Sequence, residues 1–419
     1  MTTRNNLTAF LACVLLSQAA PARADAVTYW NDVAVTAVTV GRAGGQGFVD
    51  MALVHAAMHD AVQAIQRRFQ PYAANVQGTG SPGAAAGAAA YGVLAGIYPM
   101  QRGLLDMKYK EFVAADGLTG NPGLKVGEQV AAALLKEHRP IVSMPDFRGG
   151  TGIGQWRPTP SLIGTPPAPA PFSPMAFVHL AEARPYTLNS PSQFRPAAPP
   201  PLTSAEYLRD YNEVKALGSR RSTTRTQAQT DLAYFWAGNY VEQWNRALRD
   251  ISVKRSMEIG DSARLFALAN LAAADAAIAC WDAKRFFYFW RPVTAIQEGE
   301  RDNIPGTIGD PAWEPLINTP NYPDFTSGAN VVTAAMTTTL EQFFGTDEFS
   351  FTITSSVPEA TQKSRSYKRF SDAAQEVVDA RILLGIHFRF ADEVARTQGS
   401  NVARWTFPRF LRPVAGGRQ

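Results

Sequence analysis

The sequence predicts a mainly helical protein, and three observations support this class. Most of the chain after residue 25 carries apolar residues at three- and four-residue spacing, the period of an amphipathic helix. Alanine-rich segments suit close packing of helices. Glycine and proline gather in one segment, residues 148–202. With 419 residues, 46% of them hydrophobic, the chain is long enough for one large domain or two packed halves.

Residues 1–24 have the pattern of a signal peptide. Arg4 precedes the apolar run LTAFLACVLL, and small residues flank Arg23. Cleavage near Ala24 predicts an exported protein, periplasmic or secreted, that begins near Asp25. The leader's apolar run is too short for a stable membrane span, and no second run of about 18 or more apolar residues is evident. No membrane span is therefore expected in the mature chain.

Loss of the leader changes the charge and the cysteine content. Without Arg4 and Arg23 the formal net charge falls from +4 to +2, and nothing in it suggests a nucleic-acid partner. Without Cys13, Cys280 is the remaining cysteine. An intramolecular disulfide is then excluded, so the stability of the exported protein must come from its core.

The N-terminal half, residues 25–147, is expected to contain four helices: 46–67, 82–98, 103–115 and 124–138. His55 and His59 lie one turn apart in the first of them. Such a pair can bind a metal, but no third ligand at a suitable spacing is evident. Packing or local hydrogen bonding is the preferred interpretation of both histidines.

Residues 148–202 are interpreted as an ordered crossover on the surface that lines an access channel. Their glycines and prolines disfavour helix interiors. Gly152 and Gly154 suggest a phosphate loop only weakly, because no strand or helix start frames them. Helical spacing returns over residues 203–419, beginning with a capping pattern at Ser204.

The stretch CWDAKRFFYFWRPV, residues 280–293, contains two cations. Lys284 and Arg291 are seven residues apart, so on an ideal helix they lie within about 20° of each other and roughly 10 Å apart along the axis. Their long side chains can then meet on one small anion. Pro292 biases Arg291 away from helical geometry and predicts the helix end. For this stretch alone, cations near a helix C-terminus are the simpler explanation.

Two later segments also allow either a structural or an anion-binding interpretation. Ser327 and Gly328 lead into a helical pattern, where a plain N-cap is a better interpretation than an anion site if the segment is taken alone. Residues 367–399 predict a long helix interrupted or tightened around Gly385. On an ideal helix Arg381 and His387 lie about 120° apart, so they share a target only through the reach of arginine or a helix irregularity.

Together these residues resemble the three-part signature of the vanadium-dependent haloperoxidases and the type 2 phosphatidic acid phosphatase superfamily. That signature is Lys, six residues, Arg-Pro; then Pro-Ser-Gly-His; then Ser-Arg, five residues, His, three residues, Asp. The corresponding blocks here are Lys284 to Pro292, Thr326 to Ala329 and Ala380 to Ala391. Further likeness to bacterial exported members, in VHAAMHDAVQAI and ADAAIACWDAK among others, extends the resemblance over most of the mature chain.

The resemblance implies an all-α architecture of two packed helical bundles, with an oxyanion held in the C-terminal one. The residues that would bind vanadate oxygens are Lys284, Arg291, Ser327, Gly328 and Arg381. His387 would be the axial vanadium ligand or, in a phosphatase, the nucleophile. Phosphate is expected to fit the same site, since three cations and helix-end donors stabilise either a trigonal-bipyramidal vanadate or a phosphoryl transition state.

The chain departs from the signature at four positions: Thr326 replaces the proline, Ala329 the histidine, Ala380 the serine and Ala391 the aspartate, with Asp392 one residue late. The change at Ala329 matters most, because the family's histidine is its acid-base group, and such groups typically contribute about a hundredfold to ten-thousandfold. Asn330 can donate a hydrogen bond but no proton. Asp324, His55 or His59 could substitute only if folding brings one close.

The leading functional hypothesis is vanadate-dependent halide oxidation driven by hydrogen peroxide, with a halide and a small organic acceptor as further partners. Loss of the acid should harm a phosphatase more, because alkyl leaving groups need protonation. The alternatives are a periplasmic acid phosphatase that cleaves phosphomonoesters with His387 as nucleophile, and a degenerate member that binds an oxyanion without turnover.

Overall fold

The computed structural model describes residues 25–42, 44–137, 144–159 and 173–414. The predicted signal peptide, residues 1–24, lies outside this part. The N-terminal helices are α1 (Ala26–Gly41), α2 (Gly45–Gln66), α3 (Pro82–Ile97), η1 (Pro99–Gln101), α4 (Arg102–Ala115) and α5 (Pro122–Glu137), where η marks a 3-10 helix. The four helices predicted in this half are thus confirmed, and α1 is an additional one.

Small residues explain how these helices pack. α3 is built largely of alanine and glycine, and it packs against both α2 and α5. A Cβ atom at Gly127 of α5 would lie 2.3 Å from the carbonyl oxygen of Ala85 in α3. The two backbones therefore approach so closely that only glycine fits at this position.

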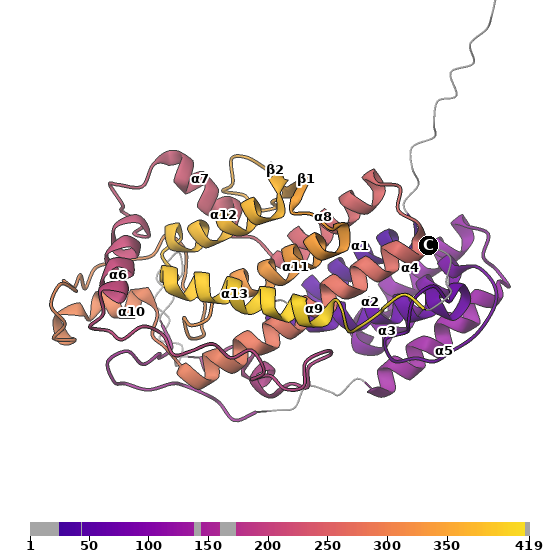
Figure 1. Ribbon diagram of the computed structural model, residues 1–419, viewed down its shortest axis with the longest axis horizontal. Helices are drawn as coiled ribbons and strands as arrows, with labels where there is room; N and C mark the ends of the chain where they lie inside the picture. Colours follow the sequence, from indigo (N-terminus) through magenta and orange to yellow (C-terminus); the bar gives the residue numbers. More distant parts are fainter. Residues whose placement is uncertain (1–24, 43, 138–143, 160–172, 415–419) are drawn as a thin grey trace, which may run out of the picture.

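The remaining helices are η2 (Val178–Glu182), α6 (Ala205–Leu217), α7 (Gln227–Phe235), α8 (Tyr240–Lys254), α9 (Ile259–Phe287), α10 (Pro292–Gln297), η3 (Gly299–Arg301), α11 (Gly328–Phe344), α12 (Phe370–Leu383) and α13 (Arg389–Thr406). Figure 1 shows an elongated molecule with α3 and α5 at one end, α6 and α10 at the other, and α9 running between them. The predicted helical class is confirmed. The predicted boundaries between the two halves remain a prediction.

Helix α9 is the centre of the core. In the part of the chain that the structure describes, it is the one helix long and apolar enough to cross a membrane, and 94% of its most apolar window is buried inside the protein. Asp275 lies within that window, so α9 contains no uninterrupted apolar run of 18 residues. Packing explains its apolar residues, because α9 contacts α2, α11 and α13.

The crossover is tied to α9 by two aspartates. Asp275 accepts hydrogen bonds from the backbone N–H groups of residues 186–188, at 2.6 to 3.1 Å. Asp282 forms an ion pair with Arg195 at 2.7 Å. In the described parts of residues 148–202, the helical structure is the single turn of η2. The crossover is thus irregular but held along the core helix.

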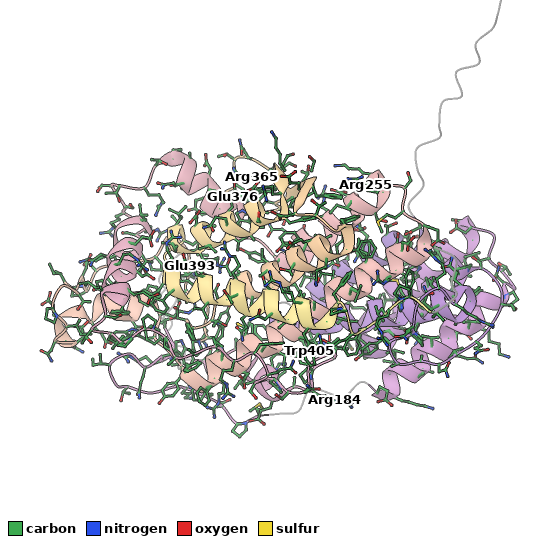
Figure 2. The ribbon with its side chains drawn as sticks, viewed as in Figure 1. Arg184, Arg255, Arg365, Glu376, Glu393 and Trp405 are labelled. Carbon is green, nitrogen blue, oxygen red and sulfur yellow. The ribbon has the colours of Figure 1, made fainter. Side chains whose placement is uncertain are left out.

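A β-hairpin interrupts the helical fold. β1 (Glu348–Thr354) pairs antiparallel with β2 (Ser364–Arg369), and inward-facing residues such as Phe351 are buried. Arg365 of β2 forms an ion pair with Glu376 of α12 at 2.8 Å, which joins the hairpin to the helices (Figure 2). The all-α prediction missed this hairpin, because its strands are short.

Residues 367–399 do not form one continuous helix. α12 begins only at Phe370, because the preceding residues belong to β2, and it ends at Leu383. Gly385 lies in the break with a φ of 77°, and a Cβ atom there would lie 2.4 Å from the carbonyl oxygen of Gly218. The predicted interruption at Gly385 is confirmed, and its cause is this close approach of two backbones.

Candidate oxyanion site

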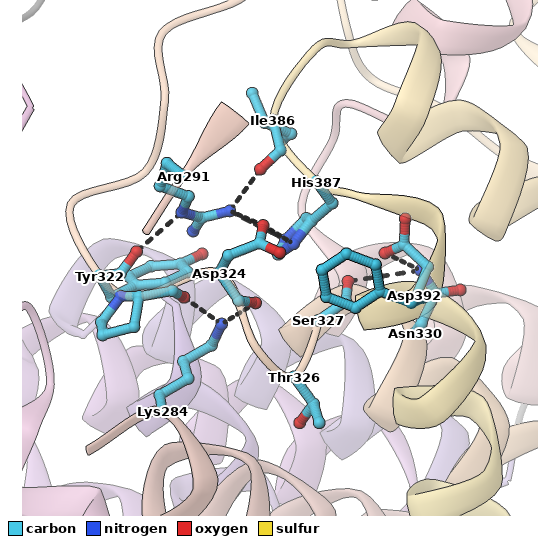
Figure 3. A network of polar contacts seen from close by, with 12 residues as sticks. Lys284, Arg291, Tyr322, Asp324, Thr326, Ser327, Asn330, Ile386, His387 and Asp392 are labelled. Carbon is cyan, nitrogen blue, oxygen red and sulfur yellow. Dashed lines mark hydrogen bonds and ion pairs between the residues drawn. The ribbon is translucent and has the colours of Figure 1, made fainter. Parts of the chain in front are cut away.

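Lys284 lies in the last turn of α9 and points into a buried polar cluster (Figure 3). Its ammonium donates hydrogen bonds to the carbonyl oxygens of Pro323, at 2.6 Å, and Asp324, at 3.0 Å. These bonds use two of the three ammonium hydrogens, so one is left for a ligand. Burial lowers the pKa of Lys284 to about 7. A nearby anion would favour its charged form.

Arg291 reaches the same cluster from outside the helix. α9 ends before Tyr288, which has a left-handed φ of 34°. The next residues are extended, and the backbone N–H of Trp290 donates to the carbonyl oxygen of Gly154 in the crossover at 3.0 Å. The predicted placement of Lys284 and Arg291 on one helical face is therefore wrong. They converge because the chain turns after α9 and the crossover holds it there.

Carbonyl groups and an aromatic ring fix the guanidinium of Arg291. Its Nε donates to the carbonyl oxygen of Tyr322 at 2.8 Å, and its Nη1 donates to that of Ile386 at 2.6 Å. The Tyr322 ring centre lies 4.9 Å from the cationic groups of both Arg291 and Lys284. Cation–π contacts of this kind are stabilising. Tyr322 was missed in the sequence, where only its position before Pro323 could have signalled it.

His387 lies in the break between α12 and α13, and Arg381 lies in the last turn of α12. They are 1% and 7% exposed. Burial lowers the pKa of His387 well below its ordinary value, and the positive charges of Arg291, Lys284 and Arg381 each lower it further. The break at Gly385 thus brings a neutral histidine and three cations together, which ideal helical geometry does not.

Asp324 contacts His387 at the centre of the cluster. Its Oδ1 lies 2.7 Å from His387 Nδ1 and 3.6 Å from Arg291 Nη1. Arg291 Nη1 lies 3.1 Å from His387 Nε2. This arrangement favours a proton on Nδ1, so that the Nε2 lone pair accepts from Arg291 Nη1. Burial raises the pKa of Asp324 to about 7. The signature has its aspartate where Ala391 stands, and Asp324 supplies a carboxyl to His387 from another block.

The N-terminus of α11 forms the opposite side of the cluster. Ser327 occupies the N-cap position, yet its side chain makes no capping hydrogen bond. Asn330 Nδ2 donates instead to Ser327 Oγ at 3.3 Å and to Asp392 Oδ1 at 2.7 Å. The interpretation of Ser327 as a plain N-cap is therefore wrong. The first N–H groups of a helix, including that of Gly328, have no partner within the helix and are suited to an anion.

Unpartnered polar atoms show what the cluster can bind. Within the described ranges, Arg291 Nη2, Arg381 Nε and Asp392 Oδ2 are buried without a hydrogen-bond partner. Nearly all buried polar atoms in folded proteins are hydrogen-bonded, so such a group of exceptions indicates a ligand site. Cationic donors beside a helix N-terminus match a tetrahedral oxyanion. The predicted oxyanion-binding residues therefore fit that group, and the Nε2 lone pair of His387 could bind it in place of its contact with Arg291 Nη1.

Among the described residues, no other histidine takes the place of the signature's acid-base histidine. Ala329 is half-buried in the first turn of α11. His55 Nε2 lies 2.8 Å from Asn31 Nδ2, and His59 contacts a backbone carbonyl at 3.0 Å, which confirms local hydrogen bonding for both. No group of three or more His, Cys, Asp or Glu able to hold a metal ion occurs among the described residues. Of the three possible substitutes, only Asp324 enters the cluster.

Comparisons with known proteins find sequence similarity in the C-terminal part of the chain. Residues 264–416 match the family described as the VCPO second helical-bundle domain. A vanadium chloroperoxidase from Curvularia inaequalis is 32% identical over 166 residues, which cover 32% of this chain. The matched segment spans 27% of the length of that relative.

Solved structures extend the likeness to the overall fold. A bacterial vanadium-dependent iodoperoxidase has a TM-score of 0.75 at 23% identity, and the match covers 92% of this chain and 97% of the other. The apo form of a bacterial vanadium-dependent chloroperoxidase has a TM-score of 0.69 at 18% identity, with 86% and 92% covered. The sequence of the C-terminal bundle is thus similar to that of the vanadium chloroperoxidase family, and the overall fold is that of the vanadium haloperoxidases.

Proposed function

We propose that this protein binds vanadate and uses hydrogen peroxide to oxidise a halide. One observation carries the proposal: three buried cations converge on a buried neutral histidine, beside donor atoms that have no partner. The relatives named as chloroperoxidase and iodoperoxidase support the reaction class. Export of the protein belongs to the same proposal, and N-terminal sequencing of the mature protein would test it.

Different side chains would make different contacts with the oxyanion. Lys284, Arg291 and Arg381 would neutralise its oxygens in a water-poor environment, where charge-assisted hydrogen bonds are strong. The His387 Nε2 lone pair would bind vanadium, and Asp324 would hold the ring through Nδ1. When bound, vanadate would activate hydrogen peroxide toward attack by the halide. Ala329 supplies no proton, so slow turnover is expected.

The test uses the mature protein stripped of bound oxyanions, with and without added vanadate. Peroxide-dependent bromination of a phenol dye and hydrolysis of an aryl phosphate are measured on the same preparation. We expect bromination that requires vanadate and is lost in His387→Ala, because the side chain that would bind vanadium is then missing. His59→Gln is the matched control, since His59 is buried but lies outside the cluster.

Other outcomes would favour the alternatives. Phosphatase activity that vanadate inhibits and that requires His387 would support the acid phosphatase. Oxyanion binding without either activity would support a degenerate member. If Lys284→Ala changed neither activity nor vanadate affinity, the proposed site would be wrong.

A further inference from the structure

Asp392 is a fully buried carboxyl beside the proposed oxyanion site. It is 0% exposed, and its Oδ1 accepts the hydrogen bond from Asn330 Nδ2 at 2.7 Å. The same amide donates to the hydroxyl of Ser327, so Asp392 lies next to a residue proposed to bind the oxyanion. Its second oxygen, Oδ2, has no hydrogen-bond partner in the described part of the chain.

The cations of the site influence Asp392 electrostatically, but none of them donates a hydrogen bond to its free oxygen Oδ2. Lys284, Arg291 and Arg381 all lie within electrostatic reach of this carboxyl. Arg381 Nε nevertheless has no hydrogen-bond partner, like Asp392 Oδ2. The cluster therefore contains both buried donors and a buried acceptor without partners. A carboxyl that served only to neutralise an arginine would be expected to use both oxygens in that contact.

Donors and acceptor make opposite demands on a ligand. The free atoms Arg291 Nη2 and Arg381 Nε require acceptor oxygens. Burial raises the pKa of Asp392 well above its ordinary value, whereas the positive charge of Arg381 lowers it. In its carboxylate form, Asp392 requires an O–H group at Oδ2. We propose that Asp392 makes the site selective for tetrahedral oxyanions that carry a proton, by accepting a hydrogen bond from their O–H group. The inference rests on the oxyanion site of the proposed function but not on its turnover.

Four oxyanions can test this selectivity, because they form two pairs of similar shape that differ in whether the ligand carries a proton. Vanadate and phosphate keep at least one proton near neutral pH, whereas molybdate and sulfate are fully ionised. Molybdate resembles vanadate in shape, as sulfate resembles phosphate. A fully ionised ligand would place an oxygen lone pair against the Asp392 carboxylate. Sites built around one hydrogen bond to a ligand O–H strongly reject analogues without it.

The experiment measures the affinity of the mature protein for these four oxyanions by calorimetry at pH 8. We expect molybdate to bind on the order of a hundredfold more weakly than vanadate, and sulfate more weakly than phosphate by a similar factor. In Asp392→Asn the new amide can donate to an ionised oxygen, so both ratios should fall toward one. Glu393→Gln removes the neighbouring, exposed charge and should leave both ratios unchanged.

Each result decides the matter. Equal binding of vanadate and molybdate by the wild-type protein would overturn the proposal, and this measurement requires no variant. So would a folded Asp392→Asn protein, with a thermal transition like the wild type, that keeps the wild-type ratios. Selective binding without bromination would support the inference and contradict the proposed function. Failure of all four oxyanions to bind would overturn both.

Discussion

Two buried polar networks in this protein differ in how completely their polar atoms are paired by hydrogen bonds. In the first, Asn31 Nδ2 donates to Asn245 Oδ1 at 2.7 Å and lies 2.8 Å from His55 Nε2, while Asn245 and Asn270 exchange hydrogen bonds. In the second, at the oxyanion site, buried arginine and aspartate atoms lack partners. Both networks contain a buried histidine, so burial alone does not separate them.

The difference separates a structural network from a binding one. Asparagine side chains can both donate and accept, and Arg249 Nη1 donates to Asn31 Oδ1 at 2.6 Å, so this network joins α1, α2, α8 and α9 and, among the described residues, leaves only His55 Nδ1 without a partner. Charged groups at the second site cost free energy when they are buried without partners. Their persistence in the fold is explained if a ligand completes the network. The following predictions test this contrast, from the largest expected effect to the smallest.

Ala329→His should give the largest change. The half-buried position at the first turn of α11 would regain the acid-base group that the signature has there. We expect the rate of vanadate-dependent bromination to rise by about a hundredfold to ten-thousandfold. Ala329→Gln, which adds a side chain without a titratable group, is the control. An equal gain in both variants would contradict the acid-base explanation.

Gly385→Ala should damage the binding network specifically. Its Cβ atom would lie 2.4 Å from the Gly218 carbonyl oxygen at a φ of 77°, so the segment carrying His387 must move. We expect the free energy of unfolding to fall by roughly 1–3 kcal/mol and vanadate affinity to fall at least tenfold. Gly345→Ala is matched, because its φ is 73° with nothing within 4 Å. It should lose stability without losing affinity, as denaturant unfolding and vanadate titration would show.

The structural network should respond to pH through His55. Burial lowers the pKa of His55 to about 3, so the unfolded chain binds a proton more readily than the folded one. The stability that the neutral ring contributes is present above pH 6.5 and is lost as the pH falls toward 3. From pH 6.5 to 5 we expect a loss of about 2 kcal/mol from this residue. His55→Gln should have a shallower dependence in urea unfolding; an unchanged slope would contradict the assignment.

Ser327→Ala should give the smallest effect. The buried Ser327 side chain makes no capping bond but accepts from Asn330 Nδ2, so we expect the free energy of unfolding to fall by about 0.5–1.5 kcal/mol. Vanadate affinity should fall up to about tenfold through the lost hydroxyl. Ser204→Ala is the control, since Ser204 caps α6 by accepting from the backbone N–H of Tyr207 at 3.1 Å. It should cost about 1 kcal/mol of stability and no affinity.

Much of the fold could be predicted from local patterns. Apolar spacing located α2, α3, α4 and α5, because each helix buries one face or all of its surface. The hairpin was missed, since a short alternating run between two helical patterns carries little signal. The helix predicted through residue 367 failed for the same reason. Local periodicity reports which residues are buried, but it does not report where the chain turns.

The candidate site was predicted as a set of residues and not as a geometry. Helical spacing suggested how Lys284 and Arg291 would meet, yet they meet through the turn after α9. The same reasoning kept Arg381 and His387 apart, whereas the left-handed Gly385 brings them into one cluster. In both cases a turn of the backbone, and not the angle between two positions on an ideal helix, determines which side chains meet.

The sequence by itself determined the helical class, the alanine-rich core and the cations and histidine that resemble an oxyanion site. Only the tertiary structure decided which carboxyls join them. Asp324 meets His387 across 63 residues of chain, and Asp392 meets Asn330 across 62. Such contacts depend on how closely backbones approach, as at Gly218 and Gly385, and this approach is set by packing between elements far apart in sequence.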